Sequence, residues 1–368
     1  NSGFNNVGRT TCPEFGFSCS TESLLNGRTT NPWDTGMNSG GSSGGSAASV
    51  ASGIVPIAHA SDAGGSIRGP ASCCGVFGLK PSRGRVSFAP SGEGFNGLAN
   101  EHVFSRTVRD SAAVLDITSG FVAGDPYGIA LPEMTFLEAC TRDPKPLKIA
   151  FSKVTNGGHP LDPEIIFLLE KTAKLCEELG HHVEETQPIW DERMFIETSV
   201  ILWAANCFAT CNMLATLSGN QISEHTVELI NLTSYRLGKT ITAETFVNSL
   251  ENMNRISRQI APFFQQYDLF LTPTLTNVGI KNNAYVPNEF TGSVTEWFER
   301  LSESGGFLSI YNMTGQPAMS VPICISNKGF PVGVHFAAPY AKEVTLYQLA
   351  GQLERVKPWS HRIPFSHV

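Results

Sequence analysis

Apolar residues recur at helical spacing in the segment that follows Asp162 and Pro163. They stand at Ile165, Leu168, Leu169, Leu175, Cys176 and Leu179, and Gly180 ends the pattern. Positions three and four apart lie on one face of a helix. Aspartate can cap a helix and proline fits its first turn, while glycine suits its C-terminal end. The pattern therefore predicts an amphipathic helix from Asp162 to Gly180.

Shorter apolar runs predict strands, and further helical patterns lie between them. We expect strands at residues 54–60, 76–79, 84–88, 147–151, 267–271, 318–325 and 332–337, and another that begins at Val183. Helices are expected at 46–52, 111–121 and 344–353, with a mostly helical region at 191–266. In that region Trp203, Phe208, Met213 and Leu217 are interpreted as core residues. Strands that alternate with helices predict the α/β fold class.

The composition is that of a compact globular protein. Of the 368 residues, 41% are hydrophobic and 16% are charged, so the chain can bury a core. The formal net charge of −7 argues against a basic surface for nucleic acid or for an anionic membrane. No uninterrupted run of about 18 apolar residues is present, so a membrane-spanning helix is not expected.

Nine cysteines are scattered along the chain, with Cys73 and Cys74 adjacent and no Cys-x-x-Cys pair. A chain of this length is not a disulfide scaffold. We therefore expect reduced, mostly buried thiols in a cytoplasmic protein. The nine histidines show no zinc-ligand spacing, so no metal site is expected.

The stretch from Gly40 to Ser72 contains two serine clusters set among glycines. Its sequence is GGSSGGSAASVASGIVPIAHASDAGGSIRGPAS, and the leading serines, Ser42 and Ser66, are 24 positions apart. Stretches rich in glycine and serine are usually flexible linkers. This stretch is interrupted by the apolar run at 54–60, which reads as a strand and favours a site. Glycine leaves backbone N–H groups open to a ligand, and serine supplies a hydroxyl nucleophile.

The same stretch resembles the defining motif of the amidase signature family, GGSSGGS followed by D-x-GGS-x-R-x-PAS. These residues stand here at 40–46 and 62–72. The resemblance continues through GLKPSRGR at 78–85, FSRTVRD at 104–110, LTPT at 271–274, GQPA at 315–318 and GFPVG at 329–333. It covers nearly the whole of residues 1–368. The resemblance implies a single α/β/α domain with a large mixed central sheet flanked by helices.

The resemblance also implies a mechanism. Family members hydrolyse carbon–nitrogen amide bonds through a serine acyl-enzyme, with a Ser-cisSer-Lys triad and no cofactor. It implies that Ser66 is the nucleophile and that Ser42, joined to Gly41 by a cis peptide bond, is the bridging serine. The oxyanion hole is implied at the backbone amides of Ala63, Gly64, Gly65 and Ser66.

The lysine of this triad has no counterpart in the sequence. In the family it lies further upstream than the 41 residues that precede Ser42, and the first lysine here is Lys80. Lys80 belongs to the GLKP motif, whose role in the family is structural. We expect that an N-terminal part carrying the catalytic lysine is missing from this chain. A catalytically incomplete fragment or binding subunit is the alternative.

Residues around the two serines are expected to support them. Gly41, Ser43, Asp62 and Arg68 are interpreted as the scaffold of the site, with a partly exposed ion pair as the alternative for Asp62 and Arg68. His59 could serve as the base of a Ser–His mechanism. A histidine on an apolar strand is more often a core residue, however, and the usual G-x-S-x-G elbow is absent.

Three segments are expected to line the substrate pocket: residues 16–18 with Gly16 and Phe17, the loop at 89–100, and the helix at 198–208 with Trp203. The Gly-Gln-Pro sequence at 315–317 is similar to that of hydrolases of linear and cyclic amide oligomers, such as 6-aminohexanoate cyclic dimer. His335 stands where many members have glutamine. The A subunit of glutamyl-tRNA amidotransferase, which would need partner subunits, is the alternative. A small-molecule amide is the expected substrate, and a homodimer is left open.

Overall fold

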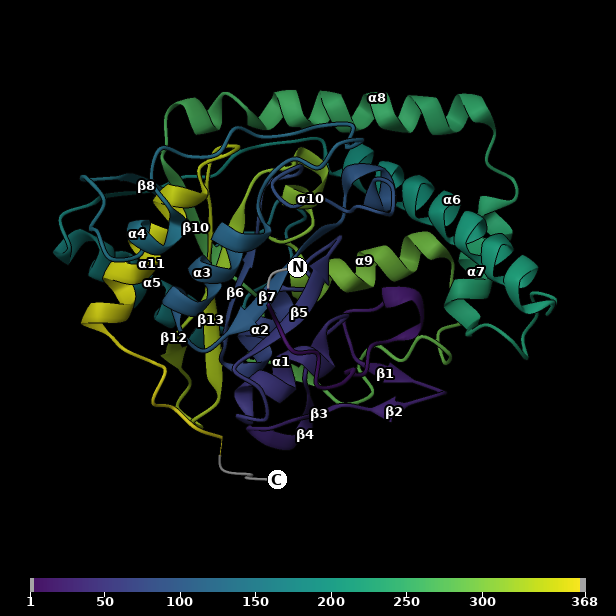
Figure 1. The fold of residues 1–368 in the computed structure, drawn as a ribbon, viewed down its shortest axis with the longest axis horizontal. Coiled ribbons are helices and arrows are strands. Elements are labelled where there is room, and N and C mark those ends of the chain that lie inside the picture. The colour runs from purple at the N-terminus through teal and green to yellow at the C-terminus, as the bar shows by residue number, and fades with distance from the viewer. Residues whose placement is uncertain (1–2, 365–368) are drawn as a thin grey trace.

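An eight-stranded sheet forms the centre of the molecule in the computed structural model, which describes residues 3–364 (Figure 1). The strand order across the sheet is β5, β7, β6, β12, β13, β10, β8, β9. In that order the strands span Ile57–Asp62, Asn100–Ser105, Phe77–Lys80, Ala318–Ile325, Pro331–Ala337, Leu269–Pro273, Lys148–Phe151 and His182–Glu185. Strand β8 runs parallel to β10 and β9, whereas the other neighbouring pairs are antiparallel. The sheet is therefore mixed, as predicted.

The central strands are buried on both faces of the sheet. On β10, Leu269 and Leu271 pack into one core and Phe270 packs into another, because successive side chains of a strand point to opposite faces. Helices α3 (Val108–Thr118), α4 (Phe136–Ala139), α5 (Pro163–Glu178) and α11 (Glu343–Val356) contribute to the first core. Helices α6 (Glu192–Ser218), α8 (Ala243–Ile260) and α10 (Ile310–Thr314) contribute to the second. This confirms the predicted α/β/α architecture.

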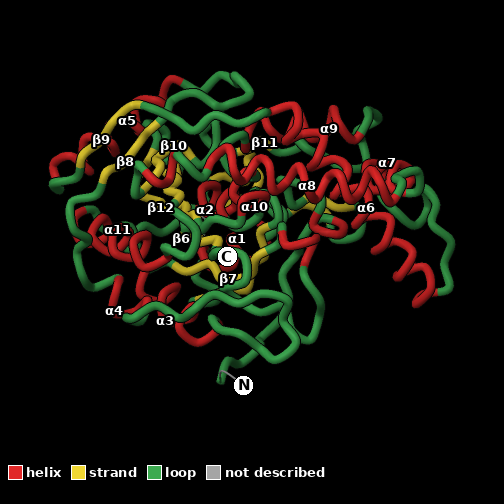
Figure 2. Tube along the Cα trace, turned by 90° about the horizontal axis from the view of Figure 1, so that it is seen from above, coloured by secondary structure: helices red, strands yellow, loops and turns green. Residues whose placement is uncertain are grey.

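A further core lies beside the edge strand β5. It is built by α1 (Gly44–Ala51), α2 (Arg68–Cys74), α7 (Leu229–Gly238) and α9 (Val294–Gly305). Two small sheets pair β1 (Glu22–Ser23) with β2 (Gly27–Arg28), and β11 (Ile280–Lys281) with β4 (Asp34–Asn38) and β3 (Thr30–Asn31). Short 3-10 turns lie at Glu14–Gly16, Gly94–Gly97 and Phe263–Gln265. Figure 2 shows α6, α7 and α9 together at one end of the molecule, with α3, α4 and α11 at the other.

Local sequence signals explain the helix predicted between Asp162 and Gly180. The side chain of Asp162 accepts a hydrogen bond from the backbone N–H of Glu164 at 2.8 Å, and Pro163 occupies the first turn of α5. The apolar stripe faces the core through Ile165, Leu168 and other buried residues. The prediction is confirmed, with the helix ending at Glu178.

Two predicted elements differ from the structure. The strand expected at 84–88 is not formed, since Val86 makes only an isolated bridge to Ser119. The helix expected at 111–121 begins at Val108, because the Thr107 side chain accepts a hydrogen bond from Asp110 N, and it ends at Thr118. The analysis of apolar runs also missed strand β7 and helix α9.

Helix α6 was only partly interpreted correctly. Met213 is 55% exposed and Leu217 is 76% exposed, so these two residues are not core residues; the last turns of α6, at 213–218, are mostly exposed to solvent. By length and composition α6 is apolar enough to cross a membrane, with a mean hydropathy of 1.5 in its most apolar window. Only 28% of that window is buried. The N-terminal half nevertheless belongs to the core through Phe195 and Leu202.

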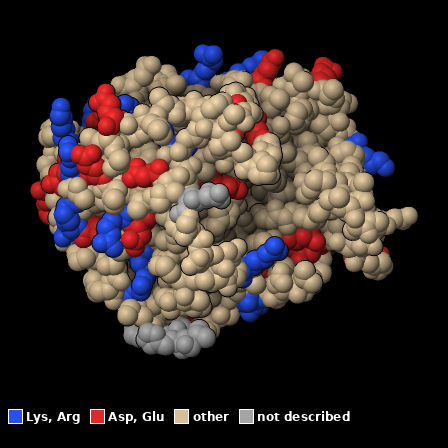
Figure 3. Space-filling model, in the orientation of Figure 1, with Lys and Arg blue, Asp and Glu red and all other residues tan. Residues whose placement is uncertain are grey.

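Acidic and basic side chains are interspersed on the face drawn in Figure 3, mostly toward one edge of the molecule. That face carries no extended patch of a single sign. All nine cysteines are free, and seven of them are buried. Cys12 is exposed and Cys19 is partly buried, so most of the thiols are buried, as predicted.

Candidate active site

Ser66 lies on the turn between β5 and α2. This turn bends sharply at Gly65, whose φ of +126° is one that residues with side chains rarely adopt. A Cβ at Gly65 would also lie 2.8 Å from Cδ1 of Leu308. Glycine is therefore required beside the predicted nucleophile, both by the backbone conformation and by close packing.

The carboxylate of Asp62 organises this turn. Its Oδ1 accepts a hydrogen bond from Gly65 N at 2.7 Å, and its Oδ2 accepts one from Ile67 N at 3.1 Å. Asp62 ends β5, so these bonds tie the last residue of the strand to both sides of Ser66. The turn is therefore stabilised by hydrogen bonds between residues of the same segment, 62–67.

Asp62 and Arg68 form a fully buried ion pair. Arg68 Nε donates to Asp62 Oδ2 at 3.0 Å, and Arg68 Nη2 donates to Asp62 Oδ1 at 3.0 Å. Both side chains are 0% exposed, so the alternative of an ordinary surface pair does not hold. Burial alone would raise the pKa of Asp62, but the charge and hydrogen bonds of Arg68 hold it well below its usual value.

Residues from distant parts of the chain complete the surroundings of Arg68. Its Nη1 donates to Leu308 O at 2.8 Å and lies 3.2 Å from His335 Nε2, and its Nη2 donates to Asn312 Oδ1 at 2.8 Å. Asn312 Nδ2 in turn donates to Asp62 Oδ1 at 2.9 Å. Sequence analysis singled out His335 only as a departure from the family, and it missed Asn312.

The tautomer of His335 follows from its neighbours. Arginine has no acceptor, so the bond from Arg68 requires an unprotonated Nε2 on His335. Nδ1 then carries the proton and donates to Thr272 Oγ1 at 3.1 Å. Burial and the charge of Arg68 lower the pKa of His335 well below its ordinary value, which keeps the ring neutral.

The peptide bond between Gly41 and Ser42 is cis, as the resemblance predicts. Gly41 packs so tightly that a Cβ would lie 2.7 Å from Ser18 O and from Ser20 N. Ser42 is 6% exposed. Among residues 3–364, no hydrogen bond joins the hydroxyls of Ser42 and Ser66, so their direct contact stays a prediction.

Ser43 connects the two serine clusters. Its hydroxyl donates to Ser61 O at 3.2 Å and accepts from Ser61 N at 3.2 Å. Because Ser61 lies on β5 immediately before Asp62, this pair of bonds fixes the N-terminal end of α1 against the strand that leads to Ser66. Ser43 thus occupies the supporting position expected from the sequence.

Ser66 opens into a narrow cavity of about 90 Å³. Besides Ser66, six residues predicted by name to be at the site line it, namely Gly16, Phe17, Gly41, Gly64, Gly65 and Trp203. Other lining residues come from segments that sequence analysis did not assign to the site, including Cys19, Phe195, Leu275, Trp297, Phe298, Leu301 and Leu308. The structure thus brings both serine clusters, residues 16–18 and helix α6 to one place.

Helix α9 is the main contributor that sequence analysis missed. Trp297, Phe298 and Leu301 all line the cavity. The helix begins with a capping box, in which Ser293 Oγ accepts from Glu296 N and the Glu296 side chain accepts from Ser293 N. A serine with glutamate three residues later, just before apolar residues, is a signal that could have revealed this helix.

Two further expectations are corrected. The loop at 89–100 lines a separate cavity with Arg83 and Tyr127, and only Phe95 reaches back to pack on Phe17 and Trp203. His59 is not a core residue: its side chain is 68% exposed on the edge strand, with Nε2 3.6 Å from Glu101 Oε2. It does not line the Ser66 cavity, which removes the basis for a Ser–His mechanism.

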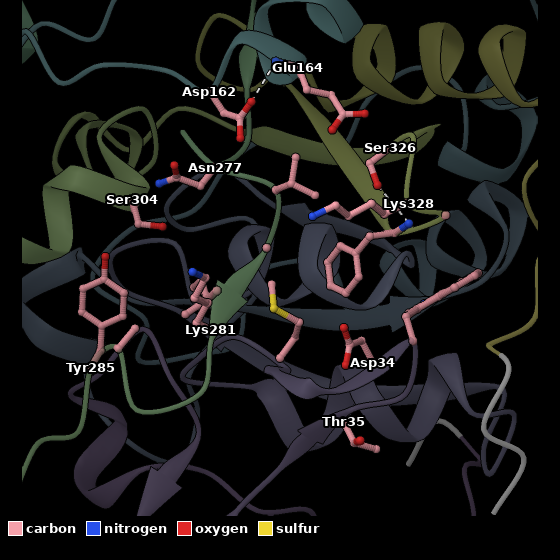
Figure 4. A pocket seen from close by; sticks show the side chains of 18 residues that line it. Asp34, Thr35, Asp162, Glu164, Asn277, Lys281, Tyr285, Ser304, Ser326 and Lys328 are labelled. Carbon is pink, nitrogen blue, oxygen red and sulfur yellow. Dashed lines mark hydrogen bonds between the residues drawn. The ribbon is translucent and has the colours of Figure 1, made fainter.

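A larger cavity of about 940 Å³ lies on the other side of Ile280 and Ser304, which line both cavities. Figure 4 shows charged side chains around it, among them Asp34, Asp162, Glu164, Lys281 and Lys328. It contains neither predicted catalytic serine. Over the described range, 3–364, no group of three or more His, Cys, Asp or Glu side chains could hold a metal ion.

The fold and this site define an amide hydrolase. The sequence model of the amidase family matches residues 1–347, and the chain belongs to that family. Hydrolysis of carbon–nitrogen amide bonds, the activity predicted from the sequence, is the activity of amidases.

Known relatives agree with this assignment. A protein of Synechocystis sp. is 34% identical over 359 residues, covering 96% of this chain and 66% of the relative. The 6-aminohexanoate-cyclic-dimer hydrolase of Paenarthrobacter ureafaciens is 32% identical over 371 residues, covering 98% and 75%. A solved structure of 6-aminohexanoate cyclic dimer hydrolase complexed with substrate has a TM-score of 0.91 and 31% identity, covering 98% of this chain and 77% of that one. The chain thus spans about two thirds to three quarters of these relatives' lengths.

Proposed function

We propose that this protein hydrolyses small-molecule amides through an acyl-enzyme on Ser66. The observation that carries the proposal is the position of Ser66, on a glycine-rich turn at the cavity, with the cis Gly41–Ser42 bond beside it. Ser66 Oγ attacks the amide carbonyl, the C–N bond breaks and the protonated amine leaves. Water then hydrolyses the ester on Ser66 and releases the carboxylic acid.

The oxyanion of the tetrahedral intermediate is stabilised by backbone amides of the same turn. Ala63, Gly64, Gly65 and Ser66 were all expected to donate. The amide of Gly65 already donates to Asp62 Oδ1 at 2.7 Å, so we assign the oxyanion to the amides of Ala63, Gly64 and Ser66. Each such donor stabilises the transition state by about 3 kcal/mol.

Proton transfer passes through Ser42 in this proposal. Ser42 takes the proton of Ser66 and passes it to a neutral lysine, as the family resemblance implies. Lys80 is not that base. Although burial and Arg68 lower the pKa of Lys80 well below its usual value, its Nζ donates to Pro81 O at 2.8 Å and it does not line the cavity.

Covalent labelling tests the nucleophile. A fluorophosphonate should label Ser66, mapped by peptide mass spectrometry, and Ser66→Ala should reduce labelling by at least ~100-fold. Ser218→Ala is the matched control, since Ser218 is exposed at the end of α6 and should leave labelling unchanged. Labelling of another serine, or labelling that Ser66→Ala leaves unchanged, would refute this assignment.

The remaining expectations are proposals of the same kind. We propose a cytoplasmic location and no nucleic-acid or membrane partner. A homodimer is the proposed assembly, which analytical ultracentrifugation would test. The net charge of −7 and the interspersed surface charges support the absence of a nucleic-acid partner. The amidotransferase-subunit alternative stays an untested prediction.

A further inference from the structure

The Ser66 cavity is lined without charged side chains, although a buried ion pair lies beside it. The residues that line the cavity all lie within the described range, 3–364. None of them is Asp, Glu, Lys, Arg or His. Its polar groups are limited to hydroxyls, a thiol, the indole N–H groups of Trp203 and Trp297, and backbone. Burial raises the pKa of the Cys19 thiol far above its usual range, so this side chain is neutral as well.

A cluster of aromatic rings forms one wall of the cavity, which Phe17, Trp203 and Phe298 line, while Phe95 packs on Phe17 and Trp203 without lining it. Trp203 is its centre: the ring centroids lie 4.4 Å from Phe17, 5.4 Å from Phe95 and 5.6 Å from Phe298. These four residues come from four separate segments of the chain. Because Trp203 contacts three rings, its side chain is fixed, and the wall presents a rigid apolar surface.

The buried ion pair beside the cavity is not available to a ligand. Asp62 and Arg68 are fully buried and are satisfied by each other, by Asn312 and by Leu308 O. Along α9, the residues that line the cavity are Trp297, Phe298, Leu301, Ser302, Ser304 and Gly305, whereas Glu299, Arg300 and Glu303 are exposed. The helix therefore turns its charges to solvent and its apolar side to the cavity.

We propose that this cavity selects amides whose acyl group is uncharged and apolar, with Trp203 as the specificity-determining residue. The inference rests on the proposed function, because it assigns the cavity to the acyl group of the substrate. A carboxylate or ammonium in the cavity would lose its hydration and find no partner of opposite charge. Acyl groups that carry a charge within the reach of the cavity are thus rejected, whereas aliphatic and aromatic groups pack on Trp203.

Isosteric primary amides test the selectivity, because a primary amide has only its acyl substituent to place in the cavity. 4-Methylpentanamide ends in an isopropyl group, and succinamate has a carboxylate of the same shape in its place. Pentanamide and 4-aminobutanamide form a second pair, with a terminal methyl against an ammonium. Dissociation constants for the 368-residue chain are measured by ligand-observed NMR titration. We expect the neutral member of each pair to bind at least ~100-fold more tightly.

Two variants assign the selectivity to the cavity. Trp203→Ala should weaken the binding of 4-methylpentanamide by about 10-fold or more, since it removes the apolar wall. Trp33→Ala is the matched control, because Trp33 lines the larger cavity and not this one. Ser302→Lys places a cation at the cavity and should strengthen succinamate binding by about 10-fold, an outcome that misfolding cannot produce.

The outcomes separate this inference from the proposed function. Equal binding within each pair, tighter binding of the charged member, or binding of no amide at all would overturn the inference. So would an effect of Trp33→Ala equal to that of Trp203→Ala. Selective binding of the neutral amides with labelling at a serine other than Ser66 would support the inference while refuting the proposed catalysis. Labelling of Ser66 without selective binding would support the proposed catalysis and overturn the inference.

Discussion

At the scale of single residues, Asp62 connects the turn that carries Ser66 to the buried side chain of Arg68. It accepts hydrogen bonds from the backbone on both sides of Ser66 and two more from Arg68, so one carboxylate determines the turn and is neutralised by its partner. Its electrostatic contribution is present above the usual pKa of aspartate and is lost only as the pH falls through its lowered pKa. The pair is therefore intact throughout the neutral range.

Asp62→Asn should destabilise the protein by about 3–5 kcal/mol, because it leaves the buried Arg68 charge without a counter-charge. Urea denaturation measures the loss. The double variant Asp62→Asn with Arg68→Met should lose less than the sum of the single variants, since it also removes the unpaired charge. Glu251→Gln is the control: it breaks the exposed pair with Arg255 and should change stability by less than about 0.5 kcal/mol. Additive effects of the two site substitutions would contradict the coupling.

At the scale of elements, α6 and α7 determine where the aromatic wall stands. Gly238 of α7 lies against the backbone of α6, so closely that a Cβ there would be 2.2 Å from Ala204 O. Ala204 is the neighbour of Trp203 in the sequence. The distance between these two helices thus bears directly on the shape of the Ser66 cavity.

Gly238→Ala tests this close contact. In an open helix, alanine in place of glycine stabilises by about 1 kcal/mol. Here the new methyl group would force the helices apart, and such overpacking costs about 1–3 kcal/mol, so we expect a net loss of stability in urea denaturation. Gly92→Ala is the control, because a Cβ at Gly92 meets no atom within 4 Å. A Gly238→Ala protein as stable as the parent would show that α6 and α7 can separate without cost.

At the scale of the whole molecule, α11 closes one face of the sheet and contacts the start of α3. The carboxylate of Glu354 on α11 accepts hydrogen bonds from Val108 N at 3.3 Å. Burial raises the pKa of Glu354 to about 7. The folded protein therefore holds a proton on Glu354 between about pH 4.5 and 7, where the unfolded chain has released it.

It follows that Glu354 lowers the free energy of unfolding as the pH rises through this window. Glu354→Gln removes the titration, so the variant should be more stable than the parent at pH 8 by about 1–2 kcal/mol, a value discounted for partial exposure. The difference should shrink toward pH 4. Urea denaturation at several pH values measures it, with the exposed Glu299→Gln as the control. A difference that does not change with pH would show that burial does not shift this group.

Much of the fold could be predicted from the sequence because its signals are local. The cap at Asp162 and the period of α5 lie within 20 residues, and the strands at 318–325 and 332–337 are short, mostly apolar segments. The strand expected at 84–88 failed for a physical reason. A strand exists only with a partner, and Val86 finds a single bridge to Ser119.

For the site, the sequence by itself determined the glycines that allow the backbone around Ser66 and Ser42, since these requirements depend on neighbouring residues. Only the tertiary structure decided what surrounds them. Asn312 reaches Arg68 from 244 positions away, and His59 is exposed because β5 is the edge of the sheet. The aromatic wall likewise joins Phe17, Trp203 and Phe298 from separate segments. Such contacts depend on how whole elements pack, and no local pattern carries that information.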